Sequence, residues 1–235
     1  LNPINNNFLT SNVSSGAKKV KESTIMEDED DDVEADDHIK RLSTFSEYKP
    51  SKFLYGKPHP DQVVETSSMA VVEPPDIFYD LQIINEVLDT GSLSSLQLEA
   101  ISYACQRHET LLDSGERAAF FIGDGPGVGK GRIIAGIIHE NKLCGREKAV
   151  WLSVSSDLRF DAIRDLADVQ CNLNVIPLNK ISYNDYISDY EGYAEDGVLF
   201  CTYSSLIGVC NNASYIFRSR LDQIGDWCGD EFDGV

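Results

Sequence analysis

The hydrophobic positions of this chain change their spacing along its length. After about residue 92, short continuous apolar runs alternate with segments whose apolar residues recur every three or four positions. These two patterns are typical of buried strands and of amphipathic helices, respectively. They predict helices over residues 92–112, 129–143, 157–169 and 215–227, and strands over 118–122, 149–154, 173–178 and 198–202. Because strands and helices alternate, we expect an α/β fold in which helices flank a parallel sheet.

The first 91 residues lack this alternation. Residues 1–49 are rich in Asn, Ser and acidic side chains, and their few large apolar residues follow no regular spacing. Burial therefore cannot offset the entropy lost on ordering, and we predict a disordered acidic tail. Residues 50–91 contain prolines at positions 50, 58, 60, 74 and 75, which exclude long helices. We expect an extended arm there, packed on a domain formed by residues 92–235.

Composition limits the partners and the compartment. The formal net charge is −19, and a large share of it comes from the acidic run 27–37. This balance disfavours nucleic-acid binding over a broad surface, so such binding would need a local groove. The six cysteines form no CxxC pair, which indicates free thiols in a reducing compartment. No apolar run approaches the roughly 18 residues of a membrane helix, so we expect no membrane partner and a location in the cytosol or nucleus.

A glycine-rich segment lies between the predicted strand 118–122 and the predicted helix 129–143. Its spaced glycines permit positive φ and let backbone N–H groups converge on an anion. The helix N-terminus behind them adds about half a positive charge, and Lys130 is expected to reach the β- and γ-phosphates as the catalytic residue. The segment predicts a site for ATP. The binding residues that we expect are Gln97, Asp124, Gly125, Gly127, Val128, Gly129, Lys130, Gly131 and Arg132.

The segment departs twice from the strict P-loop pattern. Asp124 stands where that pattern has its first glycine, but the reduced form G-x-G-K is common in helicase-type loops. Gly131 stands where Ser or Thr would place a hydroxyl on Mg²⁺, so we expect weakened or water-mediated metal coordination and no protein metal ligand. The alternative is a surface turn that binds nothing. A dinucleotide loop fits no register here, and a small-molecule kinase would need the missing hydroxyl and an Arg-rich lid.

Gln97 begins the first predicted helix, 33 residues before Lys130. A side-chain amide pairs with both a donor and an acceptor on the edge of adenine, so Gln97 is a candidate for reading the base. The alternative is an exposed glutamine on an amphipathic helix.

These residues resemble a known family. Residues 124–132 resemble the first motif of superfamily 2 helicases and chromatin remodellers, and Gln97 is similar to their adenine-reading glutamine. Residues 150–155 and 198–206 resemble the motifs that follow. Four segments, residues 63–70, 72–76, 153–158 and 202–208, together with the Gly-Lys-Gly-Arg loop, are similar to the strawberry notch proteins. The resemblance runs from about Pro58 to Val235.

The resemblance implies a RecA-like P-loop domain in a nuclear regulator of transcription. ATP and Mg²⁺ would be its cofactors, and its partners would be chromatin DNA and histones or transcription factors. The family's acidic Asp-Glu-Cys-His box and second RecA-like domain are expected beyond Val235, so we expect a domain incomplete at its C-terminus, in a fragment that is inactive alone. The chain begins with Leu1, which also suggests a fragment. The rival interpretation is a P-loop scaffold that binds proteins without hydrolysing nucleotide.

Overall fold

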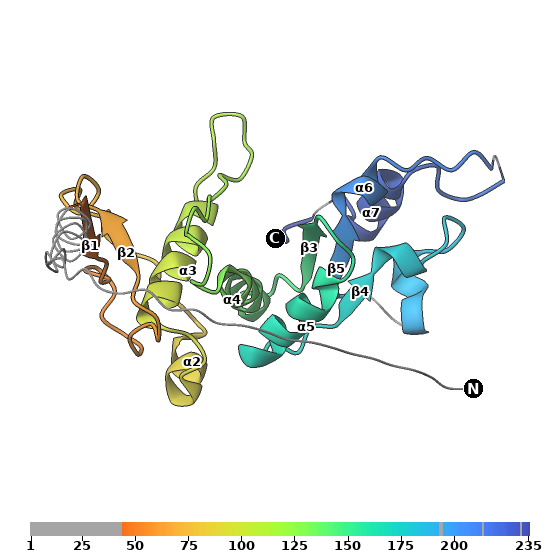
Figure 1. The fold of residues 1–235 in the computed structure, drawn as a ribbon. Coiled ribbons are helices and arrows are strands. Elements are labelled where there is room, and N and C mark those ends of the chain that lie inside the picture. The colour runs from red at the N-terminus through yellow and green to blue at the C-terminus, as the bar shows by residue number, and fades with distance from the viewer. Residues whose placement is uncertain (1–43, 193–194, 213, 231) are drawn as a thin grey trace, which may run out of the picture. The chain divides into compact units, whose positions relative to one another are not determined.

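A computed structural model describes residues 44–192, 195–212, 214–230 and 232–235 of the chain (Figure 1). The chain divides into two units, Leu1–Thr44 and Phe45–Val235. The second unit contains the helices and strands of the fold. Most of the acidic tail predicted over residues 1–49 lies outside the described residues.

A three-stranded parallel sheet forms the C-terminal half of the second unit. Its strands are β3 (Lys148–Ser153), β5 (Gly197–Thr202) and β4 (Val175–Pro177), in the order β3-β5-β4. The side chains of the central strand β5 alternate between two apolar clusters. Val198 packs with helices on one face, whereas Leu199 and Cys201 pack with Trp227 on the other. A strand buried on both faces reads as a continuous apolar run, and the predicted parallel sheet is confirmed.

Three helices pack side by side, and the last of them contacts the sheet at β4. They are α3 (Ser95–His108), α4 (Lys130–Leu143) and α5 (Leu158–Asp168). Figure 1 shows α4 between α3 and α5, and both neighbours contact it. The other face is covered by shorter elements: η1 (Leu178–Lys180), η2 (Ile187–Gly192), α6 (Tyr203–Leu206) and α7 (Arg220–Cys228). Within the described residues, no helix is both long and apolar enough to cross a bilayer.

The arm predicted over residues 50–91 is not extended throughout. It contains the strand β2 (Val64–Thr66), which pairs antiparallel with β1 (Phe45–Glu47), and the helix α2 (Ile84–Thr90). No proline follows position 75 in this segment, so nothing prevents helical hydrogen bonding there. Gly91 ends α2 with φ +65°, a conformation that favours glycine.

A buried carboxylate holds the arm against the domain. Glu140 on α4 is fully buried. It accepts hydrogen bonds from the hydroxyl of Tyr79 at 2.9 Å and from the backbone N–H groups of Gln82 and Ile83 at 3.0 Å each. Because a buried carboxylate must be hydrogen-bonded, these contacts link the chain before α2 to α4.

Some helices begin or end at other residues than the sequence predicted, and capping residues account for the shifted starts. The N-cap of α3 is Ser94 and not Ser92, because Ser94 and Gln97 form a reciprocal capping box. The helix ends at His108, four residues before the predicted end. Helix α7 begins at Arg220, after its own capping box at Ser219, and not at residue 215.

The strand predicted over residues 118–122 does not form. A strand needs a hydrogen-bonded neighbour, and the edge of β3 is instead paired with Val235, whose carbonyl accepts from the N–H of Val150 at 2.8 Å. A cavity of about 290 Å³ lies between Ile122 and β3. Phe121 is 88% exposed as a result. The apolar run predicted a strand, but a strand forms only where another strand is available to pair with it.

Candidate nucleotide-binding site

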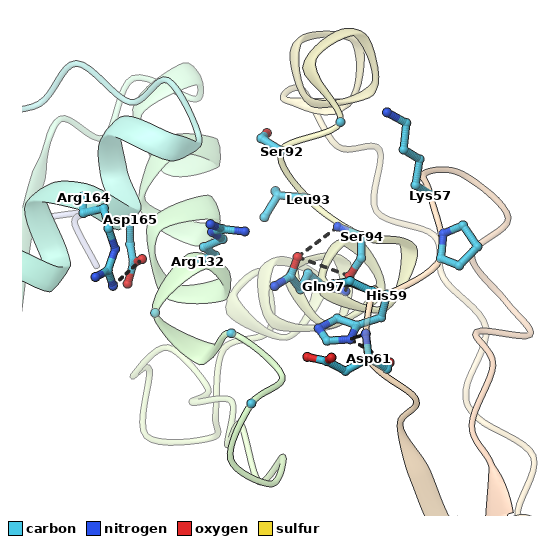
Figure 2. A pocket seen from close by; sticks show the side chains of 16 residues that line it. Lys57, His59, Asp61, Ser92, Leu93, Ser94, Gln97, Arg132, Arg164 and Asp165 are labelled. Atoms are coloured by element: carbon cyan, nitrogen blue, oxygen red, sulfur yellow. Dashed lines mark hydrogen bonds and ion pairs between the residues drawn. The ribbon is translucent and has the colours of Figure 1, made fainter.

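The glycine-rich segment borders a cavity between the arm, the start of α3 and α5. The cavity has a volume of about 700 Å³. Figure 2 shows side chains from the arm and from the start of α3 on one side of it, and Arg132, Arg164 and Asp165 on the other. Its size is within the usual range for small-molecule sites. The lining consists of residues 57–61, 91–94, 97, 127, 129, 131, 132, 164 and 165.

The backbone of the glycine-rich loop is shaped as an anion site requires. Gly127 and Gly129 have φ of +92° and +81°, and Gly129 is the N-cap of α4. No side chain caps this helix, so its first N–H groups are open to an anion. The ammonium of Lys130 donates hydrogen bonds to the carbonyls of Asp124 and Gly125 at 3.0 and 2.9 Å. Lys130 therefore lies across the loop.

Gln97 joins α3 to the loop. Its side-chain Nε2 donates to the carbonyl of Val128 at 3.0 Å, and its Oε1 accepts from the backbone N–H of Ser94 at 2.9 Å (Figure 2). Only 4% of the residue is exposed, so it is not the exposed surface glutamine of the alternative interpretation. The amide has a second N–H, for which the described residues supply no acceptor. That N–H is available to a base bound in the cavity.

The predicted binding residues are only partly brought together. Five of them line the cavity: Gln97, Gly127, Gly129, Gly131 and Arg132. Val128 is buried beneath the loop, while Asp124, Gly125 and Lys130 lie on the loop outside the lining. Arg132 donates from Nε and Nη2 to Oδ2 of Asp168 on α5, at 3.1 and 2.8 Å.

Seven polar residues of the cavity were not predicted from the sequence: Lys57, His59, Asp61, Ser92, Ser94, Arg164 and Asp165. Lys57 and His59 come from the arm, and Arg164 and Asp165 come from α5. Arg164 donates to Oδ1 of Asp165 at 3.3 Å, and this hydrogen bond raises the pKa of its guanidinium above the ordinary value. These residues lie at no regular sequence distance from the loop, so the sequence pattern did not predict their place in the cavity. The one available signal was Gly131 itself, because a glycine in place of a side chain suggests that another group fills the space.

A second, polar cavity of about 510 Å³ lies at the carboxyl ends of β3 and β5. Its lining combines two cations, Arg159 and Lys180, with several hydroxyl groups. The hydroxyl of Thr202 also caps α6 by accepting from the N–H of Ser205 at 3.3 Å. The hydroxyl residues of the lining are Ser155, Ser156, Thr202, Ser204 and Ser205.

Comparison with known proteins agrees with this geometry. Residues 58–235 match the family described as P-loop containing NTP hydrolase pore-1. The protein strawberry notch of Drosophila melanogaster is 45% identical over 211 residues, which cover 89% of this chain and 13% of that protein. Strawberry notch homolog 1 of Homo sapiens is 50% identical over 92% of this chain and 16% of its own length. FORGETTER 1 of Arabidopsis thaliana is 52% identical over 82% of this chain and 14% of its own length. No solved structure matches the chain.

The family match includes the glycine-rich loop, the helix behind it and all three strands of the sheet. The chain spans 13% to 16% of the length of these three relatives. It belongs to the strawberry notch family of P-loop containing NTP hydrolases.

Proposed function

We propose that this chain binds ATP together with Mg²⁺ in the 700 Å³ cavity. The observation that carries the proposal is that groups for both ends of the nucleotide line the same cavity. Gln97 offers an amide N–H to the base, and the loop that ends at Gly129 presents positive-φ backbone and an uncapped helix to the phosphates.

Each part of the site has a distinct task in this proposal. The N–H groups at the start of α4 bind phosphate oxygens, and Lys130 leaves the carbonyls of Asp124 and Gly125 to pair with the terminal phosphates. Mg²⁺ would neutralise the charge of the β- and γ-phosphates. The described residues contain no cluster of three or more metal-ligating side chains. Mg²⁺ at phosphate sites is usually held by phosphate oxygens, waters and one or two protein carboxylates.

Displacement of a fluorescent ATP analogue tests this proposal. We expect saturable binding in the presence of Mg²⁺, with ATP displacing the analogue better than GTP or inorganic triphosphate, since Gln97 selects the base. No saturable binding would overturn the proposal. Equal displacement by inorganic triphosphate would overturn the assignment of Gln97 to the base.

The wider role that we propose is that of a nuclear, helicase-like regulator of transcription that acts on chromatin DNA, with histones or transcription factors as partners. Kinship with the strawberry notch family supports a helicase-like role, and the polar cavity beside β3 and β5 supports contact with a phosphate backbone. The rival function is a scaffold that binds proteins without hydrolysis. ATP turnover by the longer protein, lost in Lys130→Ala, would favour the first; stoichiometric nucleotide binding without turnover would favour the second.

The polar cavity yields a prediction of its own. Replacing both Arg159 and Lys180 with Ala should weaken binding of single-stranded DNA to the longer protein by about tenfold at low salt and reduce its salt dependence, because two phosphate contacts are lost. Affinity for ATP should stay unchanged. Fluorescence anisotropy of labelled DNA over a salt series measures both effects. An unchanged salt slope in the double variant would exclude this cavity as the nucleic-acid contact.

A further inference from the structure

The carboxylate of Asp165 lies against the backbone of Gly131. Its Oδ2 lies closer to the position of a Cβ at residue 131 than two such atoms can approach, so any other residue there would force the side chain of Asp165 to shift. Asp165 projects from α5, a different helix from the one that Gly131 begins. The structure therefore explains Gly131 by close approach and not by backbone conformation, since Gly131 has no positive φ.

The same position is where a strict P-loop carries the hydroxyl that binds Mg²⁺. This chain has no hydroxyl at that position, and the carboxylate of Asp165 lies in the adjacent space. Mg²⁺ at phosphate sites is bound by one or two carboxylates plus phosphate oxygens. Asp165 is 8% exposed and lines the cavity together with Gly131, so its remaining access is toward the bound nucleotide.

Within the part of the chain that the structure describes, the Oδ2 atom of Asp165 makes no ion pair with the arginines near it. Arg164 bonds only to Oδ1, and the described residues supply no donor for Oδ2. Arg132, the other cation of this wall, is paired with Asp168 (Figure 2 shows its side chain on the same side of the cavity as Asp165). A carboxylate oxygen that faces the cavity would repel a triphosphate bound there, whereas a divalent ion between the two groups would be attracted by both.

We propose that Asp165 supplies, from α5, the protein oxygen ligand for the nucleotide-bound divalent cation that Gly131 lacks. The proposal rests on the proposed nucleotide site. If the proposal is correct, the gain in ATP affinity from a divalent ion depends on the carboxylate of Asp165. Helix α5 is then part of the phosphate site.

Nucleotide binding with and without Mg²⁺ tests the proposal. For the unchanged chain, Mg²⁺ should tighten binding of a fluorescent ATP analogue relative to EDTA. Asp165→Asn should bind as well or better in EDTA, but should lose about tenfold of the gain from Mg²⁺, as expected when a metal site loses a protein group. Asp161→Asn, one turn earlier on α5, removes the same charge away from Gly131 and should keep the full gain.

A residue swap separates coordination from a general charge effect. Gly131→Ser alone should weaken Mg²⁺-dependent binding, because its Cβ collides with Asp165. Gly131→Ser combined with Asp165→Ala removes that collision and restores a hydroxyl, so it should recover the gain from Mg²⁺. Electron paramagnetic resonance of Mn²⁺ in the presence of ATP gives a readout independent of fluorescence, and Asp165→Asn should bind Mn²⁺ about tenfold more weakly.

The outcomes distinguish this proposal from the one on which it rests. If the unchanged chain binds no nucleotide in either condition, the nucleotide site itself is refuted. An equal gain from Mg²⁺ in the unchanged chain and in Asp165→Asn, together with equal Mn²⁺ affinity, would overturn the role of Asp165 alone.

Discussion

Replacing Lys130 with Ala should lower the affinity for ATP about 100-fold or more. A hydrogen bond to a charged group contributes about 1.5–3 kcal/mol, and the ammonium can make two such bonds to phosphate oxygens. Their combined loss of about 3 kcal/mol corresponds to roughly two orders of magnitude in the dissociation constant. The variant also loses the two hydrogen bonds by which Lys130 spans the loop, to Asp124 and Gly125. Isothermal titration calorimetry in the presence of Mg²⁺ measures the change.

A second lysine of the same helix provides the control. Lys142 lies in the last turn of α4 and contacts Asn172, far along the helix from the loop. Lys142→Ala should leave ATP affinity unchanged. Both variants should unfold near the temperature of the parent, because neither lysine is buried. Equal ATP affinity in Lys130→Ala and in the parent would remove the phosphate-binding interpretation of the loop.

Gly129→Ala should damage both the stability of the domain and its nucleotide site. Gly129 has φ +81°, and a left-handed conformation costs a non-glycine residue about 1–2 kcal/mol. The new Cβ would also lie 2.5 Å from Nε2 of Gln97, which is closer than the two atoms can approach. Relieving that contact breaks the hydrogen bond from Gln97 to Val128. We expect a loss of about 2 kcal/mol in unfolding free energy and more than tenfold in ATP affinity.

The neighbouring glycine of the motif is a matched control. Gly125 has no positive φ, and a Cβ added there would meet no atom within 4 Å. Gly125→Ala should therefore change the unfolding free energy by less than about 0.5 kcal/mol. Urea denaturation of the two variants gives the comparison directly. Equal stability of Gly129→Ala and Gly125→Ala would show that the left-handed turn at Gly129 does not form in the protein.

Gln97 connects the start of α3 with the glycine-rich loop. It caps α3 through Ser94 and holds the loop through Val128, so one side chain fixes the spacing between a helix and a phosphate loop 31 residues away. The sequence motif suggested a residue that reads a base. The fold adds a structural role, and Gln97→Ala would remove both together.

Much of this arrangement follows from local pattern. The spacing of apolar residues located the ends of α4, β3 and β5 within one residue, because this spacing reflects burial that repeats along one element. The glycines and Lys130 identified the phosphate loop for a similar reason. Its chemistry depends on consecutive backbone groups and on the helix that follows, all of which are local in the chain.

The remaining features depend on contacts between distant segments. The run 118–122 is apolar enough for a strand, but a strand forms only where a neighbour offers hydrogen bonds, and β3 pairs with Val235 instead. The arm residues of the cavity wall lie beside α3 because the carbonyl of Lys57 accepts a hydrogen bond from the N–H of Ser95 at 2.8 Å. Asp165 reaches Gly131 because α4 and α5 pack together. The spacing of residues in the sequence does not predict such contacts. Side chains 34 positions apart become neighbours only when the helices that bear them pack together.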